Sequence, residues 1–322
     1  MPEQKMKNRW QHSDPRYIYS FVAKRYFSEM KTKIEIAEEL GVSRFKVARL
    51  IDESIEQGYV KFIFPKQQVL DEEITRNLCE KYNLHDTVIL SISDSWSSQE
   101  QLNVKLGGIT AQYLTKNLKE GMKLGVAWGR VLSSTVSQLE SLPPLDVVQL
   151  SGVHPGIEFS QGPIDLIHKI ASVSQGKAYP MYVPMWVDDK NLALKLCEDP
   201  AVMETQKFYS NLDVIITGIG DWKSGSSSLY DIFPKSWSTP LINQDIAADI
   251  CITLVNSKGE ILASPMTSYG FGITSEQLRN TKKVIGVAGG EEKYQGIVAS
   301  LKSGLLDVLI TDFDTATKLL NE

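Results

Sequence analysis

The chain has 322 residues, of which 42% are apolar and 23% are charged, so it has room for one large globular domain and a smaller one. Its first residues are polar and no window has the roughly eighteen unbroken apolar residues of a membrane span, which argues against a signal sequence and a transmembrane helix. Cys79, Cys197 and Cys251 stand far apart without a CxxC pair. This pattern predicts a protein of the reducing cytoplasm, with no zinc site, no disulfide framework and no cofactor.

The net charge of −5 is unevenly distributed along the chain. Residues 1–66 carry 13 Lys and Arg against 9 Asp and Glu, a net charge of +4, which leaves −9 for the remaining 256 residues. Phosphate contacts need Lys and Arg, so a basic segment beside an acidic body is typical of a small nucleic-acid-binding domain joined to a domain that does not touch DNA. An ordinary solvated surface explains a bias of this size equally well.

Residues 1–66 contain the pattern of a helix-turn-helix. Thr32 is placed to cap a helix over 33–40 and Gly41 to end it, and Ser43 is placed to cap a second helix over 44–57. Each helix has one apolar face, formed by Ile36, Ala37 and Leu40 in the first and by Val47, Leu50 and Ile51 in the second. The spacing of Ala37, Gly41 and Val47 lets the two helices cross closely, with the second presented to a major groove.

Two further elements are expected around this pair. The apolar pattern of residues 15–30 predicts a third helix that packs over the helix pair. The run YVKFIF at 59–64 predicts a short strand, as in a winged helix-turn-helix.

The exposed face of the second helix is basic near its N-terminal half. Arg and Lys donate to guanine edges or phosphates, and an exposed Phe contacts a thymine methyl, so this face is expected to bind DNA. An αα-hairpin with a glycine turn and no DNA role is the alternative, but the capped, tightly spaced pattern beside a basic bias favours DNA. The residues expected to bind DNA are Ser43, Arg44, Phe45, Lys46 and Arg49.

From about Gln67 short apolar runs alternate with longer amphipathic segments. Strands that are apolar throughout and alternate with helices predict an α/β domain with a doubly wound, mainly parallel sheet. Ligands bind such folds in the crevice at the carboxyl ends of the strands. The expected strands are 87–91, 124–128, 146–150, 179–183, 213–220, 260–264, 283–289 and 307–312.

Three of these strands end in glycine-rich loops that offer backbone N–H donors, and two of the loops add a cation. A phosphate ester with polyol hydroxyls needs cations for its charge and a carboxylate for its hydroxyls, which Arg130, Lys293 and Asp221 supply. The candidate effector-binding residues in these loops are Gly125, Trp128, Gly129, Arg130, Ser133, Ser134, Gly218, Gly220, Asp221, Gly289, Gly290 and Lys293.

A structural explanation of the same loops stays open. Glycines after strands often serve only turn geometry or close helix packing, Lys293 fits a solvated helix position, and Arg130 fits a surface ion pair. The recurrence of the pattern in three loops favours a ligand-binding site over a purely structural role. The chain has no GxGxxG followed by an acidic residue at the proper distance and no GxxxxGK[ST], which argues against dinucleotide and nucleoside triphosphate binding.

Taken with the helix-turn-helix, the motifs GVAWGR (125–130), TGIG (217–220) and VAGGEEKYQGIVASLKSGLLDVLITDFDTA (287–316) resemble those of the SorC family of bacterial sugar-responsive transcriptional regulators. The likeness covers nearly the whole chain and is strongest in the last block, at Gly289, Gly290, Lys293, Thr311, Asp312, Thr315 and Ala316.

The resemblance implies a large domain similar to sugar-phosphate isomerases and deaminases of the glucosamine-6-phosphate type. It implies that the loop from Trp128 to Ser134 and Lys293 receive the phosphate or hydroxyl groups of the effector. The family's Gly-Asp-Ile is matched with Gln244, Asp245 and Ile246, so Asp245 is expected to face the sugar. Some relatives have a Gly-Gly-Thr-Thr type loop where this chain has GRVLSS. The family also implies tetramers or dimers of dimers on palindromic operators.

These observations predict a helix-turn-helix DNA-binding domain over 1–66 and a sugar-binding and oligomerisation domain over 67–322. The hypothesis is a regulator of a carbohydrate operon whose partners are double-stranded operator DNA, a sugar or sugar-phosphate effector and further copies of the chain. The alternative is a sugar-phosphate isomerase or deaminase with an appended DNA module, which needs a placed acid and base. Asp221 and His154 are the weak candidates for those roles, so no catalytic residue and no enzyme activity are expected.

Overall fold

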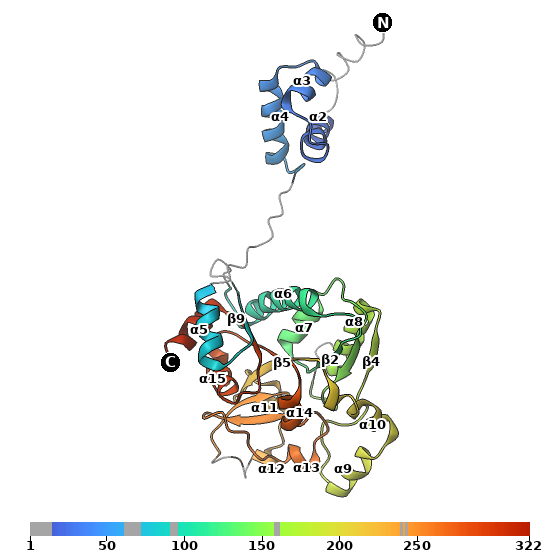
Figure 1. Cartoon of the computed structure of the whole chain (residues 1–322), viewed down its shortest axis with the longest axis vertical. Coiled ribbons are helices and arrows are strands. Elements are labelled where there is room, and N and C mark those ends of the chain that lie inside the picture. Colours follow the sequence, from blue (N-terminus) through green and yellow to red (C-terminus); the bar gives the residue numbers. More distant parts are fainter. Residues whose placement is uncertain (1–14, 61–71, 91–95, 158–161, 239–240, 242–243) are drawn as a thin grey trace. The chain divides into compact units, whose positions relative to one another are not determined.

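The computed structural model describes residues 15–60, 72–90, 96–157, 162–238, 241 and 244–322 (Figure 1). The chain forms two compact units, Met1–Gln67 and Gln68–Glu322. The division falls one residue from the boundary expected from the sequence. The smaller unit is called the head below and the larger one the body.

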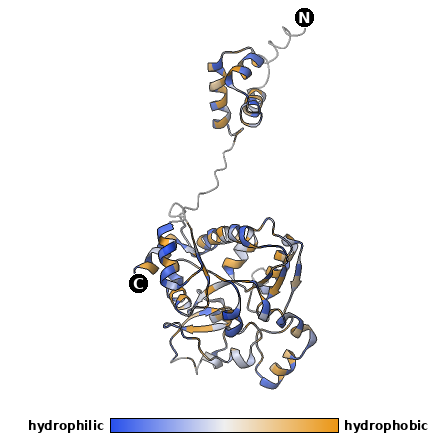
Figure 2. Ribbon diagram, in the orientation of Figure 1, coloured by the Kyte–Doolittle hydropathy of each residue, from blue (hydrophilic) through white to orange (hydrophobic). Residues whose placement is uncertain are grey.

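The head is a small helical unit with its own core. Its helices are α2 (Pro15–Ala23), a π-helical turn (Lys24–Ser28), α3 (Lys33–Leu40) and α4 (Arg44–Glu56), and α4 packs on both α2 and α3. Figure 2 shows hydrophobic and hydrophilic residues alternating along these helices. The buried apolar residues of this core are Val22, Ile36, Ala37, Leu40, Val47, Leu50 and Ile51.

The predicted bounds of α3 and the predicted start of α4 are confirmed, while α4 ends one residue earlier than predicted and the covering helix expected over 15–30 is α2 followed by the π-helical turn. The Thr32 hydroxyl accepts from the backbone N–H of Glu35 (3.3 Å) while the Glu35 carboxylate accepts from the N–H of Thr32 (2.7 Å), a reciprocal capping box. Gly41 ends α3 in the left-handed conformation (φ 67°), where glycine has no Cβ penalty. The Ser43 hydroxyl accepts from the N–H of Lys46 (3.2 Å) and caps α4. The predicted wing strand lies mostly outside the described residues, and Tyr59 is not in a strand.

The body is built on one large sheet. Its strands are β1 (Asp86–Leu90), β2 (Lys123–Val126), β3 (Asp146–Gln149), β4 (Lys177–Tyr179), β5 (Val214–Asp221), β6 (Ile246–Ile250), β7 (Thr253–Asn256), β8 (Val284–Val287) and β9 (Val308–Asp312). Seven of them are parallel, in the order β1-β9-β8-β5-β2-β3-β4. The strand order reverses beside β5, so β2, β5 and β8 lie together at the centre.

Strand β5 joins this sheet to an antiparallel hairpin. Its residues 215–218 pair in parallel with β8, and its last residues, 219–221, pair antiparallel with β6, which continues into β7. The hairpin is therefore held over the carboxyl end of the central strand.

Helices surround the sheet. Helices α6 and α7 pack on each other and lie side by side in Figure 1, α5 and α16 pack on β1, α8 packs on β3, and α15 packs on β5 and β6. None of the helices in the described part of the chain is both long enough and apolar enough to cross a membrane. The helices are α5 (Glu72–Tyr82), α6 (Gln99–Asn117), α7 (Arg130–Val136), α8 (Pro163–Ser174), α9 (Lys190–Cys197), α10 (Pro200–Gln206), α11 (Ser228–Ile232), α12 (Lys235–Ser238), α13 (Met266–Tyr269), α14 (Ser275–Asn280), α15 (Tyr294–Lys302) and α16 (Phe313–Leu320), with 3₁₀ turns at Tyr209–Asn211 and Glu291–Lys293.

The α/β fold class is confirmed, but two strand predictions are wrong. Residues 260–264 form no strand, because Ile261 makes a single bridge to Val255 while the hairpin β6–β7 takes the pairing positions beside β5. The strand expected at 179–183 lies instead at 177–179 and ends before Pro180, which has no N–H to donate to a ladder.

Candidate functional site

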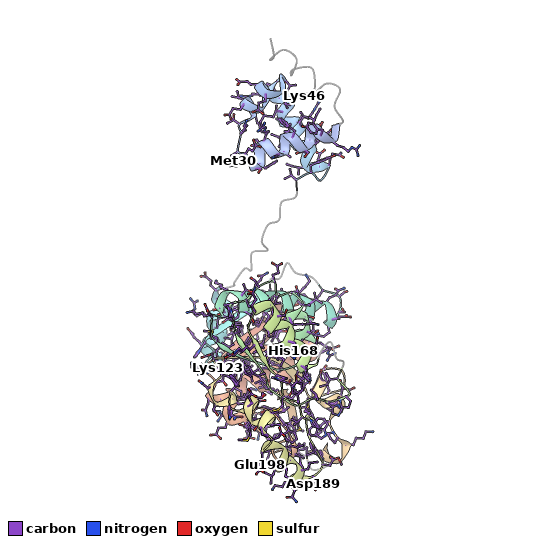
Figure 3. The ribbon with its side chains drawn as sticks, turned by 90° about the vertical axis from the view of Figure 1, so that its right-hand side faces the viewer. Met30, Lys46, Lys123, His168, Asp189 and Glu198 are labelled. Carbon is purple, nitrogen blue, oxygen red and sulfur yellow. The ribbon has the colours of Figure 1, made fainter. Side chains whose placement is uncertain are left out.

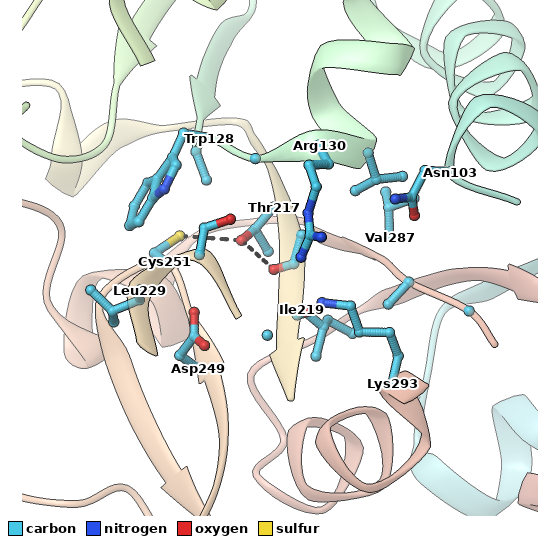
Figure 4. Close-up of a pocket in the computed structure, with 18 residues that line it drawn as sticks. Asn103, Trp128, Arg130, Thr217, Ile219, Leu229, Asp249, Cys251, Val287 and Lys293 are labelled. Atoms are coloured by element: carbon cyan, nitrogen blue, oxygen red, sulfur yellow. Dashed lines mark hydrogen bonds between the residues drawn. The ribbon is translucent and has the colours of Figure 1, made fainter. Parts of the chain in front are cut away.

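A pocket lies at the carboxyl ends of β2, β5 and β8, the three central strands (Figure 4). Helices α6 and α11, the hairpin β6–β7 and the turn before α15 complete its walls. It is lined by Asn103, Ala127, Trp128, Gly129, Arg130, Val131, Thr217, Gly218, Ile219, Gly220, Ser228, Leu229, Asp249, Cys251, Val287, Ala288, Gly289 and Lys293. The loops that the sequence singled out after three separate strands therefore meet at one place.

Lys293 ends the 3₁₀ turn that precedes α15, and its side chain reaches into the pocket. Its ammonium donates to the backbone carbonyl of Ile219 (3.0 Å) and to that of Ser226. Burial lowers the pKa of Lys293 to about 8, with repulsion from Arg130 in the same direction and attraction to Asp249 opposing it. A half-buried cation whose hydrogen-bond partners are neutral carbonyls is well placed to bind an anionic ligand.

Arg130 is the second cation, and it lies on the first turn of α7. Gly129 before it has φ 128°, a conformation open to glycine, and this turn carries the chain from β2 into the helix. The Arg130 guanidinium donates to the carbonyl of Gly225 (2.5 Å). Arg130 and Lys293 thus both hold the loop between β5 and α11 by its backbone oxygens.

Asp249 on β6 supplies a buried carboxylate. One of its oxygens accepts from the hydroxyl of Ser227 (2.5 Å). Burial raises its pKa to about 6, against the opposing effects of the Ser227 hydrogen bond and of Lys293. A Cβ at position 220 would lie 1.9 Å from an Asp249 oxygen, so Gly220 leaves the space that this carboxylate occupies.

Cys251 and Thr217 form the pocket wall next to this carboxylate. Cys251 stands at the turn of the hairpin with φ 57°, and its thiol donates to the Thr217 hydroxyl (3.5 Å), which donates to the carbonyl of Gly218 (2.8 Å). Burial raises the pKa of Cys251 to about 12, so its thiol is not a nucleophile at neutral pH.

Seven of the residues predicted for the effector line the pocket: Trp128, Gly129, Arg130, Gly218, Gly220, Gly289 and Lys293. Four others lie next to the pocket but do not line it. Gly125 is inside β2, where a Cβ would lie 2.8 Å from Leu150. Ser133 and Ser134 are on α7, and Ser134 packs against Gly107 of α6. The N–H of Gly290 donates to the Asp312 carboxylate (2.7 Å).

The two predicted aspartates also lie outside the pocket lining. The Asp221 carboxylate accepts from the N–H of Gly296 (3.2 Å) and faces Lys223 at 3.7 Å, so it anchors α15. Asp245 accepts from the Ser257 hydroxyl and lines a different groove.

The match of Gly-Asp-Ile to residues 244–246 is not supported by this placement. The aspartate in the pocket is Asp249, in the run Ala248-Asp249-Ile250, and the small residue before it is the signal that would have found it. Sequence reasoning also missed Asn103, Ser228, Leu229 and Cys251, which reach the pocket from other elements and carry no local motif. It did not assign Thr217 to the site either, although Thr217 begins the TGIG motif.

The residues considered for acid–base catalysis do not assemble. His154 stacks on Trp186 (4.7 Å between ring centroids), its Nδ1 accepts from the N–H of Gly156 (3.0 Å), and it does not line the pocket. Within the described ranges no group of three His, Cys, Asp or Glu side chains is arranged to hold a metal ion.

The head places all five predicted DNA-binding residues on its surface. The Phe45 side chain is 76% exposed, the Arg44 guanidinium lies 5.2 Å from its ring centre, and Arg49 pairs with Glu53 at 3.3 Å. Figure 3 shows Lys46 and Met30 at the outside of this unit. A helix-turn-helix with an exposed basic second helix, joined to an α/β unit with a charged pocket, defines the class of ligand-controlled transcriptional regulators.

The comparisons with known proteins give the family. Residues 67–321 match the model of the family described as "Putative sugar-binding domain", and the chain belongs to this family. It is 26% identical over 315 residues to the sorbitol operon regulator of Klebsiella pneumoniae, covering 96% of this chain and 99% of that protein. It is 24% identical over 306 residues to the deoxyribonucleoside regulator of Bacillus subtilis, covering 93% and 96%.

The fold has the same relatives. The full-length sorbitol operon regulator SorC of Klebsiella pneumoniae superposes with a TM-score of 0.82 at 24% identity, over 96% of this chain and all of that one. The resemblance to SorC regulators is thus confirmed, and the protein is a SorC-type transcriptional regulator with a sugar-binding domain. The names of these relatives are those of regulators and do not support the enzyme alternative.

Proposed function

We propose that a sugar or sugar phosphate binds in the pocket of the body and thereby controls the binding of the head to operator DNA. The observation that carries the proposal is the meeting of Lys293, Arg130 and the buried Asp249 in one pocket at the ends of the central strands. A phosphate ester of a polyol needs two kinds of partner, and this pocket holds both.

The cations are the proposed phosphate partners. Lys293 and Arg130 donate to the backbone carbonyls of Ser226 and Gly225. A phosphate brings negative charge that the backbone carbonyls lack, and Arg and Lys bind phosphate through strong, charge-assisted hydrogen bonds, so a phosphate competes well for both side chains. The Asp249 oxygen that does not bind Ser227 is the proposed acceptor for a sugar hydroxyl.

The head is the proposed DNA reader, through Ser43, Arg44, Phe45, Lys46 and Arg49. We propose double-stranded, palindromic operators and a homo-oligomer, a tetramer, that pairs the heads on them, in the cytoplasm. The exposure of the basic face of α4 and the names of the relatives support DNA as the partner. The ligand changes operator binding only if it prefers one arrangement of the heads over another.

The test is a melting-temperature screen of the full chain against sugar phosphates, the matching free sugars and inorganic phosphate. A ligand that binds the folded state stabilises it by about 2.7 kcal/mol at a concentration of 100 times its Kd. A rise with a sugar phosphate but not with its free sugar supports the phosphate site. A rise with a free sugar alone supports a sugar-binding pocket but contradicts the phosphate site. No rise in melting temperature across the panel contradicts the whole proposal.

The variant Lys293→Met tests whether a ligand that raises the melting temperature binds in this pocket. Hydrogen bonds to charged groups contribute about 1.5–3 kcal/mol, so affinity for the responding sugar phosphate should fall about 10- to 150-fold. The matched control is Lys318→Met, because Lys318 lies on α16 and pairs with Glu291 (2.7 Å) away from the pocket. Equal losses in both variants would mean that the ligand binds elsewhere.

A further inference from the structure

Trp128 has a buried polar atom without a hydrogen-bond partner in the protein. The residue follows β2, its side chain is 7% exposed, and its indole nitrogen is buried with no hydrogen-bond partner. The indole N–H is a donor and never an acceptor. Among the buried side-chain nitrogens and oxygens without partners in the described part of the chain, this is the one whose residue lines the pocket.

A buried donor without a partner is costly, and native proteins seldom keep one. Several neighbouring polar groups of the wall have hydrogen-bond partners other than the indole. The Thr217 hydroxyl accepts a hydrogen bond from the Cys251 thiol and donates one to the carbonyl of Gly218. One Asp249 oxygen accepts a hydrogen bond from the Ser227 hydroxyl. The pairing of the indole is therefore left to something that enters the pocket.

Figure 4 places the indole on the same side of the pocket as Leu229 and Cys251 and away from Lys293. The pocket thus has a cationic side and an opposite side where the Trp128 ring and Leu229 lie near the Asp249 carboxylate. An aromatic ring with one polar donor suits a sugar, which has apolar C–H faces and oxygen acceptors.

We propose that the Trp128 indole N–H donates a hydrogen bond to an oxygen of the sugar part of the ligand while its phosphate lies at Lys293 and Arg130. The proposal rests on the proposed function and adds to it a specificity-determining residue. A hydroxyl, ring or carbonyl oxygen satisfies the indole, whereas an ammonium group at that position has no lone pair to accept and is rejected. Inorganic phosphate has no sugar part and leaves the indole unpaired.

The indole N–H signals of the full chain, labelled with ¹⁵N at tryptophan, test this directly. Trp128→Phe identifies the signal of Trp128 by its disappearance. The probes are glucose 6-phosphate, fructose 6-phosphate, ribose 5-phosphate and inorganic phosphate. We expect the ligand-free proton resonance upfield, where indoles without a partner lie. A sugar phosphate that raises the melting temperature should move it downfield, and inorganic phosphate should not.

Affinity gives a second readout. A net hydrogen bond contributes about 0.5–1.5 kcal/mol, so Trp128→Phe should weaken the stabilising sugar phosphate about 2- to 12-fold. Trp237→Phe is the matched control, because Trp237 packs between Phe233 and Tyr269 outside the pocket and should leave the affinity unchanged.

Two outcomes overturn the inference. A ligand-free resonance that is already downfield means that the protein or an ordered water pairs the N–H. A sugar phosphate that stabilises the protein but leaves the resonance in place means that the ligand does not reach Trp128. If no probe raises the melting temperature, the proposed function fails, while the ligand-free resonance still decides whether the donor is unpaired.

Discussion

The head and the body assemble their working surfaces in opposite ways. In the head, all five proposed DNA contacts come from a run of seven consecutive residues, Ser43 to Arg49, and a single capped helix presents them. In the body, Arg130 contacts Gly225, 95 positions away, and Lys293 contacts Ile219, 74 positions away. The function of the head is a property of one helix, whereas that of the body is a property of a whole sheet.

The two units also differ in what holds them together. Seven buried apolar residues form the core of the head, while the body buries the sides of a parallel sheet between helices. A small core has little stability to lose, so the head is expected to be the weaker unit. Substitutions that act on one unit alone test whether the two units differ in this way.

Removal of one core side chain from the head should give the largest effect. Ile36 is fully buried, and Ile→Ala in a core costs about 2–5 kcal/mol, which exceeds what a unit of this size can spare. Ile36→Ala should therefore abolish operator binding in a gel-shift assay. The body should keep its calorimetric transition and its response to sugar phosphates; loss of that response would show that the units depend on each other.

Asp249→Asn tests the buried charge of the body. Burial raises the pKa of Asp249 from 3.8 in the unfolded chain to about 6, so between these values the folded protein holds a proton that the unfolded chain has released. The stability of the body should fall by up to about 3 kcal/mol as the pH rises from 4 to 6. Denaturant titrations over this range should show the fall in the wild type and its loss in Asp249→Asn.

The exposed Asp245 provides the control for this prediction. Asp245→Asn should keep the pH profile of the wild type, because its carboxylate is outside the pocket. The charged groups that face Asp249 are Lys293 and Asp221, and the lowered pKa of Lys293, about 8, places its titration above this range. An unchanged profile in Asp249→Asn would mean that another carboxyl group causes the fall.

The same contrast explains what the sequence could predict. Thr32, Gly41 and Ser43 were assigned correctly because a cap acts on backbone groups within four residues, so its signal is local. Most strands of the body were also found, since a parallel strand is an unbroken apolar run. The pocket loops were found because glycines follow those runs.

What the sequence missed depends on distant partners. Asp249 was passed over in favour of Asp245, because its role comes from Ser227, 22 positions away, and from the Lys293 charge. The hairpin β6–β7 was missed since its strands are short and pair with the end of β5 rather than with the main sheet. Asp221 was predicted to bind the ligand because it follows a glycine-rich strand end, but its carboxylate accepts a hydrogen bond from the N–H of Gly296 instead.

Arg49→Ala tests the DNA-binding face of the head and should have a smaller effect. The Arg49 side chain is 66% exposed and pairs only at the surface with Glu53, so its loss should not unfold the head. A lost base or phosphate contact should weaken operator binding by about 1–3 kcal/mol in a gel-shift titration. Lys24→Ala is the control, because it removes one positive charge from the π-helical turn outside α4. An equal loss of operator binding in this variant would mean that only the net charge of the head matters, not a contact of Arg49.

The smallest predicted effect compares one kind of cap in the two units. Thr32 caps α3 in the head and Ser98 caps α6 in the body, each by accepting a backbone N–H, at 3.3 Å and 3.2 Å. Thr32→Ala and Ser98→Ala should each cost about 1 kcal/mol. Because entropy of unfolding grows with size, that loss should lower the melting temperature of a small unit by about 4–8 °C and of a large one by about 2–4 °C. Calorimetry of the full chain should therefore show the larger shift in the head transition for Thr32→Ala, and equal shifts in a single shared transition would mean that the two units unfold as one.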